Sequence, residues 1–122
     1  VWNQKWAEQA FMKEQGVQLE AWAPFAEGNG DIFRQPVLKA MAEKYGKTTG
    51  QVMLRWLLQR GIVVIPKSVH KARMQENFDV FDFALDDSDM EAIKALDTKK
   101  STIYDEMDPN VAMFIATHKL HD

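Results

Sequence analysis

Apolar and polar positions alternate along this chain with two different periods. A helical period predicts helices over residues 2–14, 36–46, 49–60 and about 87–97, and a β-type pattern predicts short strands over 17–22 and 62–66. Parallel strands need a long connection, which is usually helical. The order of strand, helices and strand therefore predicts one βαβ-type crossover unit.

Cap residues set the expected ends of these helices. Pro36 suits the first turn of one helix, and Gly46 suits its end. Thr48 is expected to cap the next helix, with Gln51 three residues later as its capping-box partner, and Gly61 is expected to end that helix. We interpret the tryptophans of the first helix, Trp2 and Trp6, as core residues.

The second predicted strand is the centre of the pattern. Its four β-branched residues, Ile62 to Ile65, predict a strand buried on both faces, as in parallel sheets. Pro66 cannot donate a ladder hydrogen bond and marks the end of the strand. In the first strand, Val17, Leu19 and Ala21 alternate with Gln18, Glu20 and Trp22.

A basic corner follows the second strand. Lys67 comes directly after Pro66, and Arg73 lies in the helix that we expect to follow, on one face with Glu76 and Asn77. A helix N-terminus with nearby cations is suited to bind an anion such as phosphate. The alternative is that both cations are solvated and that Glu76 is an ion-pair partner of Arg73.

Composition narrows the function classes. Among 122 residues, 15 are basic and 18 acidic, and the formal net charge is −3. No basic stripe or charge block favours nucleic acid or an anionic membrane as partner. The chain has no cysteine, which excludes disulfides, and no apolar run of bilayer length. We therefore expect a cytoplasmic protein that binds neither nucleic acid nor membrane.

The spacings of the histidines and of four aspartates do not favour a metal site. The aspartates, Asp82, Asp86, Asp87 and Asp89, fit a capped helix start instead.

Three segments in register resemble the aldo-keto reductase family. The segment Ile65 to Val69, followed by Arg73, Glu76 and Asn77, resembles the cofactor segment at the end of the family's eighth strand. The segment Glu20 to Phe25 resembles the seventh strand and its loop, and Thr49 to Gly61 resembles the helix between the two strands. The resemblance extends over about residues 10–97.

The resemblance implies an α/β fold, the C-terminal portion of a (β/α)8 TIM barrel that is incomplete in this chain. A whole barrel of this type takes about 250 residues. Residues 1–97 would be the C-terminal half of the barrel, with the polar face of the first strand pointing inward. Residues 98–122 would be a tail over the substrate pocket or a disordered segment, with Tyr104, Met107, Met113, Phe114 and His118 scattered among charges.

The resemblance also implies an NADP(H) site and a role for each of its residues. Trp22 would stack on the nicotinamide, although a rim or core aromatic is the alternative. The loop from residue 23 to 30 would fold over the pyrophosphate, although it could be an ordinary connection. Lys67, Ser68 and Arg73 would bind the adenosine 2′-phosphate, Glu76 and Asn77 would read the adenine, and His70 would donate to a phosphate or lie at the surface. The implied cofactor residues are Trp22, Ala23, Pro24, Phe25, Glu27, Lys67, Ser68, Val69, His70, Arg73, Glu76 and Asn77.

Reduction of a carbonyl also needs an acid that protonates the oxygen. In the family this is a tyrosine, helped by a lysine, an aspartate and a histidine from the first half of the barrel, and no position here matches them. The expected substrate is a small aldehyde or ketone. The expected partner is the missing first half or a second copy of the chain, because an incomplete barrel leaves sheet edges unpaired. The alternatives are a non-catalytic nucleotide-binding subunit and an inactive truncated fragment.

Overall fold

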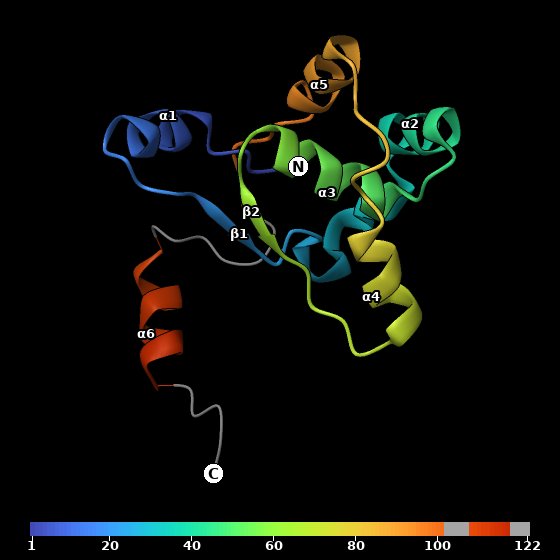
Figure 1. Ribbon diagram of the computed structural model, residues 1–122. Coiled ribbons are helices and arrows are strands. Elements are labelled where there is room, and N and C mark those ends of the chain that lie inside the picture. The colour runs from blue at the N-terminus through green and yellow to red at the C-terminus, as the bar shows by residue number, and fades with distance from the viewer. Residues whose placement is uncertain (102–107, 118–122) are drawn as a thin grey trace.

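The computed structural model describes residues 1–101 and 108–117, a mixed α/β arrangement around one central helix (Figure 1). Tyr104, Met107, His118 and His121 lie outside the described residues. The elements in chain order are α1 (Trp6–Glu14), β1 (Glu20–Trp22), the 3₁₀ helix η1 (Ala26–Arg34), α2 (Pro36–Tyr45), α3 (Thr49–Gln59), β2 (Val63–Ile65), α4 (Lys71–Phe78), α5 (Asp87–Lys94) and α6 (Pro109–Thr117).

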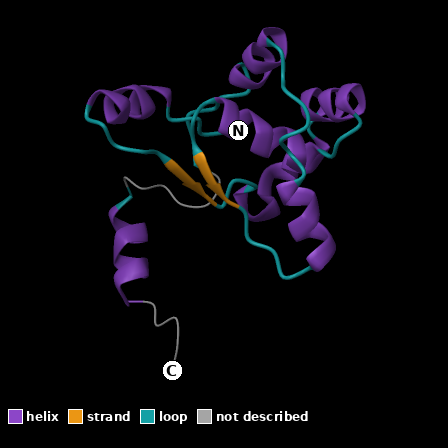
Figure 2. Cartoon of the chain, in the orientation of Figure 1, coloured by secondary structure: helices purple, strands orange, loops and turns teal. Residues whose placement is uncertain are grey.

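In the described part of the chain, β1 and β2 form a two-stranded parallel sheet (Figure 2). The register pairs Glu20 with Val63 and Trp22 with Ile65, so both strands end at the same edge. The segment between them contains η1, α2 and α3. The predicted βαβ-type crossover is therefore confirmed.

The two faces of this sheet differ in burial. Ala21 and Val64 pack against the hydrophobic core. On the opposite face, Trp22 is 64% exposed and Ile65 is 55% exposed. The prediction that the second strand is buried on both faces is wrong for this chain, because the core covers only one face of a two-stranded sheet.

Both strands are shorter than the apolar pattern predicted. The backbone N–H of Val17 donates to the carbonyl of Met12 at 2.8 Å, so residue 17 still belongs to the turn that ends α1. The N–H of Ile62 donates to Leu57 at 3.0 Å and closes the end of α3 in the same way. Pro66 then ends β2, because it has no N–H for a further ladder bond.

Helix α3 is the centre of the core. Most of its residues are buried, because strand β2, helices α2 and α4, and η1 all contact it. The buried cluster contains Ile32, Leu38, Met41, Ala42, Val52, Met53, Trp56, Leu57, Ile62, Leu85 and Ile93. Phe78, the last residue of α4, and Phe81 are exposed, whereas Val80 and Leu85 in the following segment are buried.

The helix that the pattern predicts over residues 2–14 begins only at Trp6, so that prediction is wrong for residues 2–5. Gln4 is buried, and its side chain donates to the carbonyl of Ile93 at 2.8 Å. The N–H of Thr98 donates to the carbonyl of Trp2 at 2.8 Å. These bonds hold residues 1–5 against the end of α5, and α1 begins at Trp6 after Lys5 in a left-handed conformation (φ 54°).

Trp6 joins α1 to α3 through an aromatic and cationic stack. Its ring meets that of the fully buried Trp56 edge-on, with centroids 6.3 Å apart. The guanidinium of Arg60 lies 3.7 Å from the Trp6 centroid and 4.5 Å from the Trp56 centroid. Partial burial lowers the pKa of Arg60 to about 10, although the negative charge of Asp97 acts to raise that pKa. Trp6 is thus a packing residue, although it remains 36% exposed.

Two predicted helix ends are confirmed in detail. Thr48 and Gln51 form a capping box at the start of α3. Gly46 ends α2 in the left-handed conformation, with φ 63°. Pro36 occupies the first turn of α2, and Gln35 caps that helix by accepting from the N–H of Val37 at 2.5 Å.

Two glycines should respond oppositely to alanine. A Cβ added at Gly50, in α3, would lie 3.7 Å from the rings of Phe25 and Phe33, which is ordinary contact. We expect Gly50→Ala to raise the free energy of unfolding by about 0.4–1 kcal/mol. We expect Gly46→Ala to lower it by about 1–2 kcal/mol, because a side chain at positive φ is strained. Urea unfolding of both variants measures the change in the free energy of unfolding. Destabilisation by Gly50→Ala would contradict the packing described.

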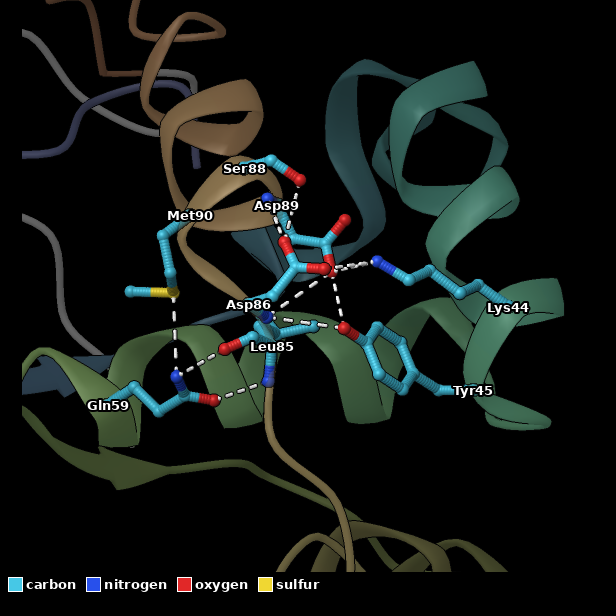
Figure 3. Close-up of polar contacts among 8 residues, drawn as sticks. All are labelled: Lys44, Tyr45, Gln59, Leu85, Asp86, Ser88, Asp89 and Met90. Carbon is cyan, nitrogen blue, oxygen red and sulfur yellow. Dashed lines mark hydrogen bonds and ion pairs between the residues drawn. The ribbon is translucent and has the colours of Figure 1, made fainter.

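A polar cluster fastens α5 to α2 and α3 (Figure 3). The Lys44 ammonium lies 2.6 Å from an oxygen of Asp86 and 2.9 Å from one of Asp89. The Tyr45 hydroxyl also donates to Asp89. The Gln59 side chain donates to the carbonyl of Leu85 at 2.9 Å and accepts from its N–H at 2.7 Å. Asp86 and Asp89 form the capping box of α5, which confirms the capped helix start that the sequence predicted.

This cluster should make stability depend on pH in acid. Hydrogen bonding from Lys44 holds the pKa of Asp86 well below its usual range. The stabilisation is therefore present above the unfolded-state pKa of about 4 and is lost as the pH falls through the lower folded-state pKa. We expect Lys44→Ala to destabilise the protein at pH 7 and to match the wild type in strong acid. Lys39→Ala, on the same helix, is the control, and an equal Lys44→Ala deficit at both pH values would contradict the account.

Helix α6 is the last described element and leaves Met113 and Phe114 exposed. Whether this region covers a substrate pocket stays a prediction. None of the helices within residues 1–101 and 108–117 is long and apolar enough to cross a membrane.

Candidate functional site

The predicted site residues follow the two strands. Residues 22–27 begin at the end of β1, and residues 67–77 begin just after β2. Because the strands are parallel and Trp22 pairs with Ile65, both segments start at the same edge of the sheet. The carboxyl ends of parallel strands are where α/β folds place their ligands.

The basic corner is open to solvent. Lys67 and Arg73 are exposed, and neither side chain has a hydrogen-bond or ion-pair partner within residues 1–101 and 108–117. Ser68 Oγ accepts from the N–H of His70 at 3.2 Å and shapes the turn into α4. No side chain caps α4, so its first-turn N–H groups are not used by a cap. Two cations beside an uncapped helix start are suited to a phosphate.

The alternative pairing of Arg73 with Glu76 does not occur. The Glu76 carboxylate instead accepts from the Thr48 hydroxyl at 2.6 Å. Asn77 is half-buried beside it on α4. The structure therefore leaves Arg73 available to a ligand and ties Glu76 to α3.

The loop after β1 has an unusual backbone. Ala23, Ala26 and Glu27 all have positive φ, at 46°, 51° and 54°. Residues other than glycine rarely adopt positive φ, and residues that do so cluster at functional sites. Alanine and glutamate carry no sequence signal for positive φ, so the conformation of Ala23, Ala26 and Glu27 could not be predicted.

The side chains of this loop divide into exposed and packed groups. Trp22 presents its ring on the open face of the sheet. Pro24 is buried, and Phe25 packs on Phe33 with ring centroids 5.6 Å apart. The Glu27 carboxylate is exposed and has no hydrogen-bond or ion-pair partner in the described ranges.

The site residues do not share one cavity. Trp22, Ala23 and Pro24 border a hollow of about 430 Å³ between β1, the end of α3 and the N-terminal segment. Lys67, Arg73 and Glu76 are not among the residues that line it. Within the described residues, the two segments thus start at one edge of the sheet, and the hollow beside Trp22 does not extend to the basic corner.

In the described part of the chain, the one tyrosine is Tyr45. Tyr45 donates its hydroxyl to Asp89 in the cluster that holds α5. Within residues 1–101 and 108–117, no three His, Cys, Asp or Glu side chains are grouped as metal ligands. The described residues at this edge of the sheet include two exposed cations, Lys67 and Arg73, and the exposed ring of Trp22.

Known proteins of similar sequence are reductases. The chain is 49% identical over 84 residues to methylglyoxal reductase DkgA of Escherichia coli (strain K12), which covers 69% of this chain and 30% of that protein. It is 49% identical over 86 residues to glyoxal reductase of Bacillus subtilis (strain 168), covering 70% of this chain and 30% of that protein. The chain thus spans about a third of the length of these curated relatives.

Solved structures of similar fold include an aldo-keto reductase and a protein in complex with NADPH. An aldo-keto reductase enzyme from a Medee basin deep-sea metagenome library superposes with a TM-score of 0.83 at 40% identity, over 88% of this chain and 39% of that one. A Gox0644 mutant crystallised in complex with NADPH superposes with a TM-score of 0.77 at 38% identity, over 89% of this chain and 39% of that one.

The family model of the aldo/keto reductases matches residues 33–98, a little over half of the chain. The match contains α2, α3, β2, α4 and α5, and so includes the basic corner. The resemblance inferred from the sequence is confirmed: this chain belongs to the aldo/keto reductase family.

Proposed function

We propose that this chain is the cofactor-binding part of an NADP(H)-dependent aldo-keto reductase, which reduces small aldehydes or ketones to alcohols. The observation that carries the proposal is the pair of unpartnered cations, Lys67 and Arg73, at the uncapped start of α4. Membership of the reductase family and the NADPH complex of a similar structure support the same cofactor.

The basic corner fits the extra phosphate of NADP(H). A phosphate monoester is best held by several charge-assisted donors, and a planar guanidinium can bind it with two parallel bonds. Arg73, Lys67 and the Ser68 hydroxyl are the side-chain donors here, and the backbone N–H of Val69 and those of the first turn of α4 add further donors. We assign the adenosine 2′-phosphate to this corner.

The other end of the cofactor fits the open face of the sheet. Trp22 presents a large exposed ring at the end of β1, and an exposed aromatic is suited to stack on a flat nicotinamide. The strained loop from Ala23 to Glu27, with Phe25 packed beneath it, would follow the pyrophosphate. Glu76 and Asn77 on α4 would contact the adenine. When bound, NADPH would supply the hydride, and these residues would orient it.

The exposed apolar residues support an incomplete barrel, with residues 1–97 as its C-terminal half and the following residues as a tail. One uncovered patch is the open sheet face, with Trp22, Val63 and Ile65. A second lies on α4 and the loop after it, where Met74, Phe78 and Phe81 border a shallow hollow of about 790 Å³. Both strands also have a free edge. We infer that the first half of the barrel covers these patches and supplies the catalytic acid.

A complementation assay tests this function. The chain is mixed with the first part of Escherichia coli DkgA, made as a separate polypeptide, and NADPH consumption is followed with methylglyoxal. We expect turnover only when both polypeptides are present. Cofactor binding without turnover of any small carbonyl would favour a non-catalytic nucleotide-binding subunit, and the absence of both would indicate an inactive fragment.

A further inference from the structure

We propose that the capping box of α3 positions Glu76 for the adenine, with Thr48 as the positioning residue. This inference rests on the proposed function, because it concerns how one cofactor contact is oriented. Thr48 and Gln51 precede Glu76 by 28 and 25 residues in sequence, yet both bond to this residue of α4.

The Thr48 hydroxyl makes two bonds of opposite sense. Its oxygen accepts from the backbone N–H of Gln51 at 3.2 Å, which caps α3. Its hydrogen is donated to one carboxylate oxygen of Glu76 at 2.6 Å. The second carboxylate oxygen of Glu76 has no hydrogen-bond partner within the described residues, so it is left to accept from a ligand.

Gln51 fixes the backbone that carries Glu76. Its side chain is buried at 5% exposure and donates to the carbonyls of Glu76 and Asp79, at 3.1 and 2.8 Å. Its own oxygen accepts from the N–H of Thr48 at 2.9 Å. Lys47 adds ion pairs to Asp79 at 3.0 Å and Asp82 at 2.8 Å. The end of α4 is therefore held against the start of α3 independently of any ligand.

The chemistry of this arrangement favours adenine. A carboxylate with one oxygen engaged can accept from the exocyclic amino group of adenine through the other. Hypoxanthine has a carbonyl at that position and cannot donate there. If Glu76 is held in this position, the protein should bind the adenine cofactor more tightly than its hypoxanthine analogue. Substitutions that keep the cap of α3 but break the bond from Thr48 to Glu76 should then abolish this preference.

Three variants make that separation. Thr48→Ser keeps both the cap and the donated hydrogen. Thr48→Asp keeps the cap, since aspartate is a good N-cap residue, but it cannot donate to Glu76 and repels its charge. Glu76→Gln removes the acceptor charge itself. Asp86→Ala weakens the other capping box, at α5, and controls for a general loss of stability.

The experiment is a titration of each full-length variant with NADPH and with its reduced hypoxanthine analogue. We expect the wild type to prefer NADPH by about 3- to 10-fold, the ratio given by one ordinary hydrogen bond. Thr48→Ser and Asp86→Ala should keep this preference, and Thr48→Asp and Glu76→Gln should lose it while the circular dichroism stays unchanged.

Two results would overturn the inference, and they differ. An undiminished preference in Thr48→Asp would show that Glu76 does not depend on Thr48, with the proposed cofactor function intact. A wild type that binds neither nucleotide, alone or with the first part of Escherichia coli DkgA added, would defeat the proposed function and this inference together.

Discussion

Replacing both Lys67 and Arg73 by alanine should weaken NADPH binding by more than about 100-fold, because two charge-assisted contacts of about 1.5–3 kcal/mol each are lost. NADH lacks the 2′-phosphate, so its binding should change by less than about threefold, near the resolution of such a comparison. Neither cation has a partner in the described structure, so their removal breaks no internal bond. Isothermal titration with both nucleotides measures the two effects.

The matched control removes two cations elsewhere. Lys13 on α1 and Lys39 on α2 are exposed, and their replacement changes the net charge by the same amount. This double variant should bind both nucleotides as the wild type does. Equal weakening of NADPH and NADH by the Lys67 and Arg73 variant would mean that these residues do not contact the 2′-phosphate.

Replacing Trp56 by alanine should lower the free energy of unfolding by about 3–5 kcal/mol, the usual cost of removing a large buried aromatic. Trp56 is fully buried in α3, and its loss also removes the ring on which Trp6 and Arg60 pack. A domain of this size has only about 5–15 kcal/mol in total, so the variant should be largely unfolded near 37 °C. Urea unfolding followed by circular dichroism measures the change.

Trp56→Phe is the informative comparison. The indole N–H of Trp56 is buried without a hydrogen-bond partner within the described residues. Phenylalanine removes this unsatisfied donor, whose burial costs about 1–3 kcal/mol, and thereby offsets part of the lost packing. We expect Trp56→Phe to be much less destabilising than Trp56→Ala. Equal losses would contradict the central role of ring packing at this position.

The sequence predicted local structure well where the signal was local. Thr48, Gln51 and Gly46 act within one turn of their own positions, and the caps that they form were predicted correctly. The burial of Ile65 was predicted wrongly, because burial depends on what covers the open face of the sheet, and the sequence of one strand does not report that. The β-branched residues of β2 indicate a strand suited to burial on both faces, but they do not indicate whether other elements cover both faces.

The site followed the same division. The basic corner was predictable because Pro66, Lys67 and Arg73 lie close together in the sequence. The bond from Thr48 to Glu76 was not, because it joins residues 28 positions apart and uses a hydroxyl already assigned to a cap. The strained conformation of Ala23 was equally invisible, since alanine carries no signal for positive φ.

The central claim is that this chain carries the NADP(H) site, and a nucleotide titration followed by tryptophan fluorescence tests it most directly. The chain is titrated with NADPH and NADH, alone and with the first part of Escherichia coli DkgA added, and Trp22→Phe is run in parallel. We predict saturable quenching that is tighter for NADPH and is lost in Trp22→Phe. The absence of quenching by NADPH under both conditions would contradict the claim.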